Sequence, residues 1–289
     1  MNSTKGASLI LTSAFFYSTY GIWSRLMGSA FGEFSQAWTR GFGLLIFVLI
    51  FNSKYKIFKP LIKPDLPWLL TIGLAGGINQ APYYFGFQHL NIGTATLLFY
   101  AALVIGGYLL GKIFFQENMT FTKIISLVMA IIGMSLIYRF QLTPSQFLAA
   151  GMTIIAGLLG SITVILPRKL QGNYPEFQVM VSYFSAQILF NGILSLIFHD
   201  HIPNLSHTLP WLGQTAYAMA MLFANWAAIE GYKQYDASIG SLIGLAEIIF
   251  GVGFGVFIFH ETLTPSLIFG SIIIILAAAL PHLVKSSKY

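Results

Sequence analysis

A carboxylate in the middle of an apolar segment is the first candidate for chemistry in this sequence. Glu247 lies about nine residues into an apolar run that starts near residue 238, which places it ~14 Å along a helix that rises ~1.5 Å per residue. A charge at the middle of a ~30 Å hydrocarbon layer is costly unless it faces a cavity or a partner. Glu247 therefore predicts a site that binds a proton or the ammonium group of a small solute. The alternative is a carboxyl group that hydrogen-bonds between helices for packing alone.

Hydroxyl and amide side chains occur in other apolar segments, at spacings that could bring them beside such a carboxylate. Helical spacing puts Tyr17 and Tyr20 on one face together with Ser13. A lipid-facing stripe has no use for hydroxyl groups, so this face is predicted to point inward. The predicted substrate-binding set is Tyr17, Tyr20, Asn79, Tyr83, Tyr100, Asn225 and Glu247. The alternative for each tyrosine is a role as an anchor at the membrane surface.

Pro82 and Arg40 carry structural predictions. Pro82 has no backbone N–H and clashes with the preceding turn, so the segment from Gly76 is predicted to kink or break and to present Asn79. Arg40 lies close enough to the end of its segment for its side chain to extend to the membrane surface. We therefore expect Arg40 to have a structural role, with an internal partner as the alternative.

The elements that hold these residues are dictated by a composition poor in charge. Of 289 residues, 56% are hydrophobic and 8% are charged, against roughly 25% charged residues in soluble domains. This excludes a soluble enzyme. The lack of cysteine excludes a secreted disulfide scaffold, and 15 Lys and Arg residues do not make a basic patch for nucleic acid. The composition predicts a protein whose surroundings are a lipid bilayer.

Ten apolar segments are long enough to cross a bilayer, and mostly short loops separate them. They cover residues 7–27, 34–52, 67–88, 93–112, 121–138, 146–167, 177–198, 209–230, 238–259 and 266–284. The predicted fold class is an all-α integral membrane protein with ten transmembrane helices. Lys54, Lys56, Lys59 and Lys63 fall on the same side as the N-terminus, which predicts a cell-membrane protein with both termini in the cytoplasm.

The chain contains an internal repeat at a shift of 144 residues (251 − 107). Gly107, Gly111, Phe115, Glu117 and Thr120 meet Gly251, Gly255, Phe259, Glu261 and Thr264. Residues 1–142 and 143–289 are therefore predicted to be two five-span repeats. Because five is odd, the second repeat is inverted in the membrane, an architecture by which secondary transporters alternate between two open states. The two Gly-x-x-x-Gly pairs predict equivalent close helix crossings, with substrate contact as the alternative.

On these residues the chain resembles the drug/metabolite transporter superfamily, specifically its ten-span EamA-type exporters. The matching pieces are Arg40 with its neighbours, the segments 115–120 and 259–264, and Glu247 in the ninth span. Ile248 and Val104 stand where such proteins often carry a proline, so the resemblance does not by itself predict a helix break there. It implies a transporter rather than an enzyme, which moves a small metabolite such as an amino acid, commonly outward, and needs no cofactor. A coupling proton on Glu247 is the other predicted partner.

Other functions have weaker support. Residues 106–112 match the start of a phosphate-binding loop, but Ile113 replaces the required Ser or Thr and no strand precedes it, which argues against ATP-driven transport. Four residues of one external loop could ligate a metal, although a hydrated polar loop is the preferred interpretation and no metal site is predicted. They are His199, Asp200, His201 and His207. A channel or a structural membrane protein stays as the alternative, with an intramembrane lipid-modifying enzyme behind it.

Overall fold

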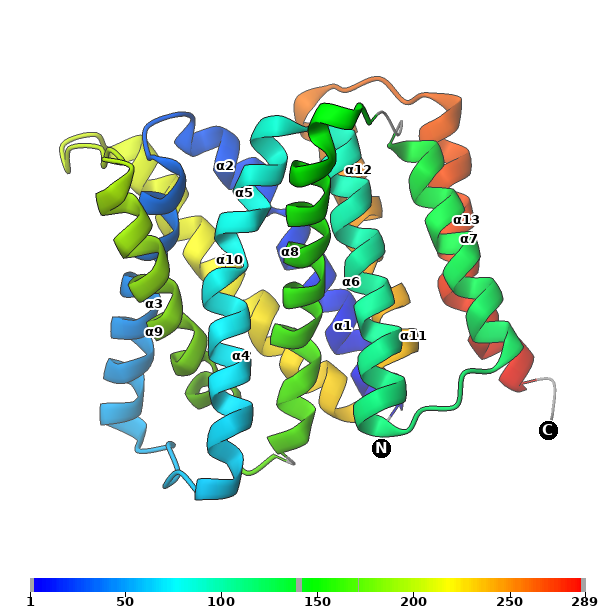
Figure 1. Cartoon of the computed structure of the whole chain (residues 1–289), viewed down its shortest axis with the longest axis horizontal. Helices are drawn as coiled ribbons and strands as arrows, with labels where there is room; N and C mark the ends of the chain where they lie inside the picture. The colour runs from blue at the N-terminus through cyan, green and yellow to red at the C-terminus, as the bar shows by residue number, and fades with distance from the viewer. Residues whose placement is uncertain (1–2, 139–141, 171, 287–289) are drawn as a thin grey trace.

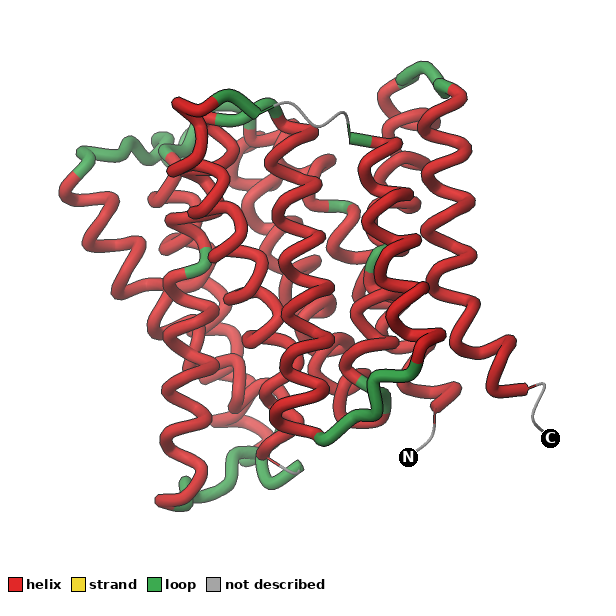
Figure 2. Tube along the Cα trace, turned by 45° about the vertical axis from the view of Figure 1, so that its right-hand side comes forward, coloured by secondary structure: helices red, strands yellow, loops and turns green. Residues whose placement is uncertain are grey.

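The computed structural model describes residues 3–138, 142–170 and 172–286, and every regular element in these ranges is a helix (Figure 2). Ten helical segments cross the bundle, three of them made of two helices in succession. They are α1 (Ser3–Ser18) with α2 (Tyr20–Met27), α3 (Glu33–Tyr55), α4 (Leu66–Ile78) with α5 (Gln80–His89), α6 (Ile92–Phe115), α7 (Phe121–Ile137), α8 (Phe147–Ile165), α9 (Glu176–Ile197), α10 (Thr208–Gln234), α11 (Ala237–Gly244) with α12 (Ala246–Phe259), and α13 (Pro265–Ser286). Short 3-10 turns η1 (Lys63–Asp65), η2 (Pro144–Gln146) and η3 (Leu166–Leu170) flank them. Each predicted span lies within a few residues of one observed segment, and the predicted fold class is confirmed.

The bundle has two ends, which we name from Figure 1. The lower end carries the α6–α7 loop, the beginning of α1 and the end of α13. The upper end carries the α12–α13 loop. Five of the described helical segments are long and apolar enough to cross a membrane by length and composition, among them α3, α6 and α9. Apolar side chains such as Ile50, Leu70 and Leu196 are exposed on the outside of the bundle, as a bilayer requires.

Three of the crossing segments are broken, at Thr19, Asn79 and Leu245, and each break lies at a predicted site residue or within two residues of one. The break predicted beside Pro82 is present at Asn79, between α4 and α5. The ninth segment breaks at Leu245 although Ile248 replaces the proline of similar proteins. There the N–H of Leu245 donates to the carbonyl of Leu242 (3.2 Å) and the N–H of Ile248 to the carbonyl of Leu245 (3.0 Å). These bonds span three residues instead of four, so one tight turn breaks the helix without a proline and puts Glu247 in the first turn of α12.

Helix contacts follow an inverted two-fold arrangement. With a shift of 144 residues, α1 corresponds to α8, α3 to α9, the α4–α5 segment to α10, α6 to the α11–α12 segment, and α7 to α13. The first helix packs along α10, and its counterpart α8 packs along α4 and α5. The pairs α3–α9 and α7–α13 each join an element to its own counterpart, and they lie at opposite edges of the bundle (Figure 1). Such contacts are what two inverted five-span repeats produce.

Candidate functional site

A cavity of about 190 Å³ lies in the centre of the bundle, between the two repeats. Its walls come from α1 to α6 and from α8 to α12, together with the breaks at Asn79 and Leu245. All seven side chains that the sequence predicts as substrate-binding line this one cavity: Tyr17, Tyr20, Asn79, Tyr83, Tyr100, Asn225 and Glu247. Residues up to 230 positions apart in the chain (247 − 17) are thus brought to one small space.

The carboxylate of Glu247 faces a tyrosine across the repeat boundary. The hydroxyl of Tyr100, on α6, donates to Oε1 of Glu247 at 2.6 Å. A hydroxyl donor at this distance makes a short hydrogen bond with the carboxyl group, which also lines the cavity. This geometry connects the two repeats through one bond at the point where the ninth segment breaks.

Two amide side chains are held by backbone carbonyls at the cavity wall. Asn225 donates through Nδ2 to the carbonyl of Met221 (2.8 Å), and its Oδ1 accepts a hydrogen bond from the hydroxyl of Tyr17 (2.9 Å). Asn79 donates through Nδ2 to the carbonyl of Ala156 on α8 (2.8 Å). These bonds fix the orientation of each amide, so each presents a defined polar edge instead of a mobile one.

Aromatic rings form most of the remaining wall. The rings of Tyr17 and Tyr20 meet edge to face with centroids 5.4 Å apart, and Tyr20 contacts Tyr217 at 4.2 Å. On the other side Phe99 lies between Tyr83 (5.1 Å) and Tyr100 (5.3 Å). Tyrosine side chains combine an apolar body with a polar tip, so this wall can hold an apolar group and hydrogen-bond a polar one.

Arg40 also lines the cavity, and the expectation that it extends to the membrane surface is wrong. Its side chain is 2% exposed, and its guanidinium lies over the ring of Tyr217 at 3.5 Å. Nη2 donates to the side-chain oxygens of Gln36 and Gln214, both at 3.3 Å, while the buried Nε has no hydrogen-bond partner among the described residues. Arg40 is held inward because the electron-rich ring and the two amides replace water around the cation. The alternative of an internal partner is the one observed.

The sequence prediction missed Tyr217, Tyr183 and Tyr232, which line the same cavity. Tyr217, Met221 and Asn225 are spaced four residues apart and therefore lie on one face of α10. Because Asn225 was predicted to face the site, the same spacing also predicts that Tyr217 faces it. Tyr183 on α9 is followed at the same spacing by Gln187 and Asn191, so the helical face that contains it was also marked by polar residues in the sequence.

The paired glycines do different things in the two repeats. A Cβ at Gly107 would lie 2.5 Å from Oγ of Ser241, so α6 and α11 cross closely there. At Gly251, the corresponding residue, nothing lies within 4 Å, and the predicted equivalent crossing is therefore wrong in the second repeat. Helix α6 therefore packs tightly against α11 at Gly107, whereas α12 has no such close neighbour at Gly251. Gly111 and Gly255 instead make room for the Glu side chains that follow them, with Oε2 of Glu117 and Glu261 at 2.7 and 2.5 Å from a Cβ.

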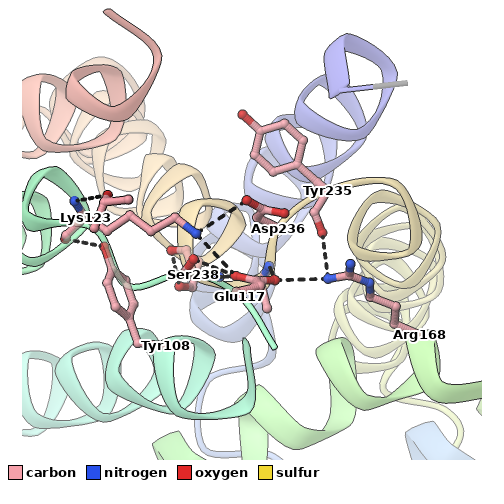
Figure 3. Close-up of polar contacts among 10 residues, drawn as sticks. Tyr108, Glu117, Lys123, Arg168, Tyr235, Asp236 and Ser238 are labelled. Atoms are coloured by element: carbon pink, nitrogen blue, oxygen red, sulfur yellow. Dashed lines mark hydrogen bonds and ion pairs between the residues drawn. The ribbon is translucent and has the colours of Figure 1, made fainter. Parts of the chain in front are cut away.

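Glu117 is the centre of an ion cluster at the lower end of the bundle (Figure 3). The Glu117 cluster consists of Glu117, Lys123, Arg168, Asp236 and Ser238. Oε1 of Glu117 accepts from Arg168 (3.0 Å) and from the backbone N–H of Ala237 (2.6 Å), and Oε2 accepts from the hydroxyl of Ser238 (2.6 Å). Lys123 lies 3.6 Å from Oε2 of Glu117 and 3.4 Å from the carboxylate of Asp236.

These contacts keep the Glu117 carboxylate ionised. Burial alone would raise its pKa, but the hydrogen bonds from Ser238 and Ala237 and the charge of Lys123 outweigh burial and hold the pKa of Glu117 below its usual value. The first turn of α11 supplies two of these donors, so the carboxylate caps that helix and fastens it to the α6–α7 loop. The sequence identified Glu117 only as a repeat marker, because Arg168, Ala237 and Ser238 lie 51 to 121 residues away.

Asp200 and His201, in the loop that follows α9, make structural hydrogen bonds. Oδ2 of Asp200 accepts from the N–H groups of Phe34 (2.6 Å) and Ser35 (2.8 Å) and thereby caps α3, while Nε2 of His201 bonds to the carbonyl of Ser29 (2.9 Å). In the described part of the chain, no group of three His, Asp or Glu side chains is placed to hold a metal ion. The preferred interpretation of this loop as a polar connection fits these contacts.

The fold and the cavity together define a helical membrane protein in which two inverted repeats enclose one central site. The chain belongs to the EamA-like transporter family, whose model matches residues 4–139 and 144–281, one match to each repeat. A solved structure described as "Crystal structure of protein" has the same fold, with a TM-score of 0.80, 15% sequence identity, and 98% of each chain covered. No curated protein matches the chain in sequence. The resemblance to the drug/metabolite transporter superfamily is thus confirmed.

Proposed function

We propose that this transporter is a secondary exporter of a small zwitterionic solute, with an amino acid of apolar side chain as the simplest example, and that it works by alternating access. The observation that carries the proposal is the presence of a carboxylate, Glu247, and a guanidinium, Arg40, in the lining of one cavity of about 190 Å³. An ammonium group would bind at Glu247 and a carboxylate at Arg40. The tyrosine wall would accept the apolar part.

Unmatched polar atoms in the wall support a polar ligand. The buried hydroxyls of Tyr20 and Tyr183 and Nε of Arg40 have no hydrogen-bond partner among the described residues. Leaving a buried donor unsatisfied costs about 1–3 kcal/mol, and a solute with several acceptors would recover that cost on binding. A purely apolar solute would leave these groups unpaired.

Glu247 is also the candidate for energy coupling. A carboxylate that binds either a proton or the ammonium group of the solute exchanges one for the other, so export of solute would accompany entry of a proton. In this proposal the lower end, with Lys54, Lys56, Lys59 and Lys63, faces the cytoplasm of the cell membrane. Pro82 and the glycines shape the helices around the site, and seven wall residues contact the solute: Tyr17, Tyr20, Asn79, Tyr83, Tyr100, Asn225 and Glu247.

Counterflow in liposomes tests the proposal. Vesicles loaded with unlabelled leucine or phenylalanine take up the labelled amino acid, and this uptake should saturate and be competed by other zwitterions. Glu247→Gln should lower the initial rate at least about tenfold and remove its dependence on pH, because a charged hydrogen bond is worth ~1.5–3 kcal/mol. Glu230→Gln is the matched control, since Glu230 lies near the lower end of α10 and does not line the cavity.

Three results would overturn the proposal. They are absence of saturable uptake for every amino acid tried, an unsaturable ion current in its place, and an unchanged rate and pH profile in Glu247→Gln. The ion current would favour a channel, because a channel conducts without a solute-bound closed state.

A further inference from the structure

Residues 144 positions apart form the same turn at the ends of α6 and α12. Gln116 has φ 53° and ψ 34°, and His260 has φ 54° and ψ 33°. The next N–H, of Glu117 or Glu261, donates to the carbonyl of Gly111 or Gly255, in both cases at 3.0 Å. In each turn the Glu side chain folds back over a glycine that has no Cβ to obstruct it. The local structure of the two carboxylates is therefore the same.

Each carboxylate also has an arginine beside it, from adjacent positions of the repeat, since Arg25 corresponds to Lys169 and not to Arg168. At the lower end the guanidinium of Arg168 lies over the ring of Phe115 (4.4 Å) and binds Glu117 at 3.0 Å. At the upper end Arg25 lies over Phe259, the residue that corresponds to Phe115, at 3.7 Å and binds Glu261 at 2.7 Å. Each carboxylate thus has an arginine that is supported by an aromatic ring.

The two ends differ in what lies beyond the arginine. The Glu117 side chain is 4% exposed and caps the first turn of α11 through Ala237 and Ser238, whereas the Glu261 side chain is 52% exposed. The residues that correspond to Ala237 and Ser238 are Gly93 and Thr94 (237 − 144 and 238 − 144), in the first turn of α6. Thr94 carries the hydroxyl that matches the one of Ser238.

We propose that Glu261 and the first turn of α6 form the upper gate of the transporter. In the second state Glu261 accepts hydrogen bonds from the N–H groups of Gly93 and Thr94 and from the hydroxyl of Thr94, as Glu117 does now from Ala237 and Ser238. The Glu117 cluster is open in that state. The inference rests on the proposed function for its purpose, since alternating access requires one end to close as the other opens.

The cations of the two gates predict which state is more populated. Lys123, which adds a second cation to the Glu117 cluster, corresponds to Leu267 in the second repeat (123 + 144). The upper gate therefore lacks one of the ionic contacts of the lower gate. The lower-closed state described here is the ground state, and the upper-closed state is the minor one that solute or a proton must populate.

Pulsed EPR distances across the upper end test this gate. Because the chain has no cysteine, the Ile92→Cys and Leu263→Cys pair takes two nitroxide labels and no others. Both positions are exposed, and neither lines the cavity nor belongs to the Glu117 cluster. The parent pair should give one long distance. Adding Glu117→Gln should create a second, shorter distance by shifting the ratio of states at least about tenfold, and adding Glu261→Gln or Thr94→Ala to that variant should remove the shorter distance again.

Two further variants keep the test decisive. Glu176→Gln is the control, because Glu176 is an ion-paired carboxylate of the lower end outside the cluster, and it should leave the distance unchanged. If Glu117→Gln does not fold, Ser238→Ala removes one donor to Oε2 and should produce a smaller shift in the same direction. A distance that responds to neither variant, or a short distance that persists without the Glu261 carboxylate, would overturn the gate.

The distance measurement requires no solute, so it separates this inference from the proposed function. Saturable amino-acid counterflow without the distance change would overturn the gate and leave the transport proposal in place. The distance change without any amino-acid flux would support the gate and overturn the choice of solute.

Discussion

Glu117 and Glu261 occupy the same turn at opposite ends of the bundle, yet one is 4% exposed and the other 52% exposed. The helix ends, the glycines beneath the carboxylates and the presence of an arginine over an aromatic ring agree between the two ends. The difference lies in whether the first turn of a helix from the other repeat is docked on the carboxylate. The two ends therefore differ in the contacts that each carboxylate makes with the other repeat, whereas the local structure around each carboxylate is the same.

Two equivalent helix–helix crossings, α6 with α8 and α12 with α1, also differ in the residues that form the contact. Helix α6 of the first repeat crosses α8 of the second so closely that a Cβ at Gly106 would lie 2.2 Å from Oγ of Ser161. The corresponding crossing of α12 with α1 has Phe250 at the position of Gly106, and its ring meets Phe15 with centroids 5.7 Å apart. Small residues allow close packing at one interface, whereas aromatic rings occupy the other.

Removing each carboxylate in turn should give the largest contrast. Glu117→Gln should lower the free energy of unfolding by about 2 kcal/mol, because Lys123 and Arg168 lose a charged acceptor in a site with little water. Glu261→Gln should cost under about 1 kcal/mol, since its ion pair with Arg25 is half exposed and well hydrated. Thermal unfolding in one detergent measures both. Equal losses would show that the two carboxylates contribute equally to the free energy of unfolding, which would contradict the difference between the two ends.

The glycine pair offers a steric form of the same comparison. Gly107→Ala should destabilise the protein by about 1.5 kcal/mol, because the new Cβ would lie 2.5 Å from Oγ of Ser241. Gly251→Ala should leave stability unchanged or raise it by up to about 1 kcal/mol, because nothing lies within 4 Å and alanine favours the helix. Melting temperatures of the two variants decide the point. A loss at both positions would indicate that α12 spends most of its time packed as α6 is.

A pH titration gives the smallest and most specific effect. Because the pKa of Glu117 is lowered in the folded protein, its ionised form contributes stability at neutral pH, and that contribution is lost as the pH falls through the lowered pKa, below about 4.3. The groups that face it are Lys123, Arg168, Asp236 and Ser238. The difference in melting temperature between the parent and Glu117→Gln should therefore shrink in acid. A constant difference across this range would mean that Glu117 is not the titrating group.

Periodicity and spacing predict much of this molecule, because a membrane-crossing helix is encoded locally. The ten spans, the break near Pro82 and the seven residues of the cavity follow from apolar length, helical faces and buried polarity. The direction of Arg40 did not follow, because it depends on Tyr217 and Gln214, which are distant in the chain. Nor did the break at Leu245, where the ladder changes from four-residue to three-residue bonds without a proline. The inequality of Gly107 and Gly251 could not be predicted either, because identical residues meet different neighbours in one conformational state.

Access to the cavity from each side tests the central claim, that the two ends close alternately, most directly. Ser13 lines the cavity, is 3% exposed, and can be replaced by cysteine with little change in size in a chain without other cysteines. A membrane-impermeant maleimide applied to either face of oriented vesicles then reports which end is open. Ser13→Cys should react at least about tenfold faster from the side of Glu261, and Glu117→Gln should add reaction from the side of Glu117. Equal reaction from both sides in the parent, or a preference that Glu117→Gln leaves unchanged, would contradict the account.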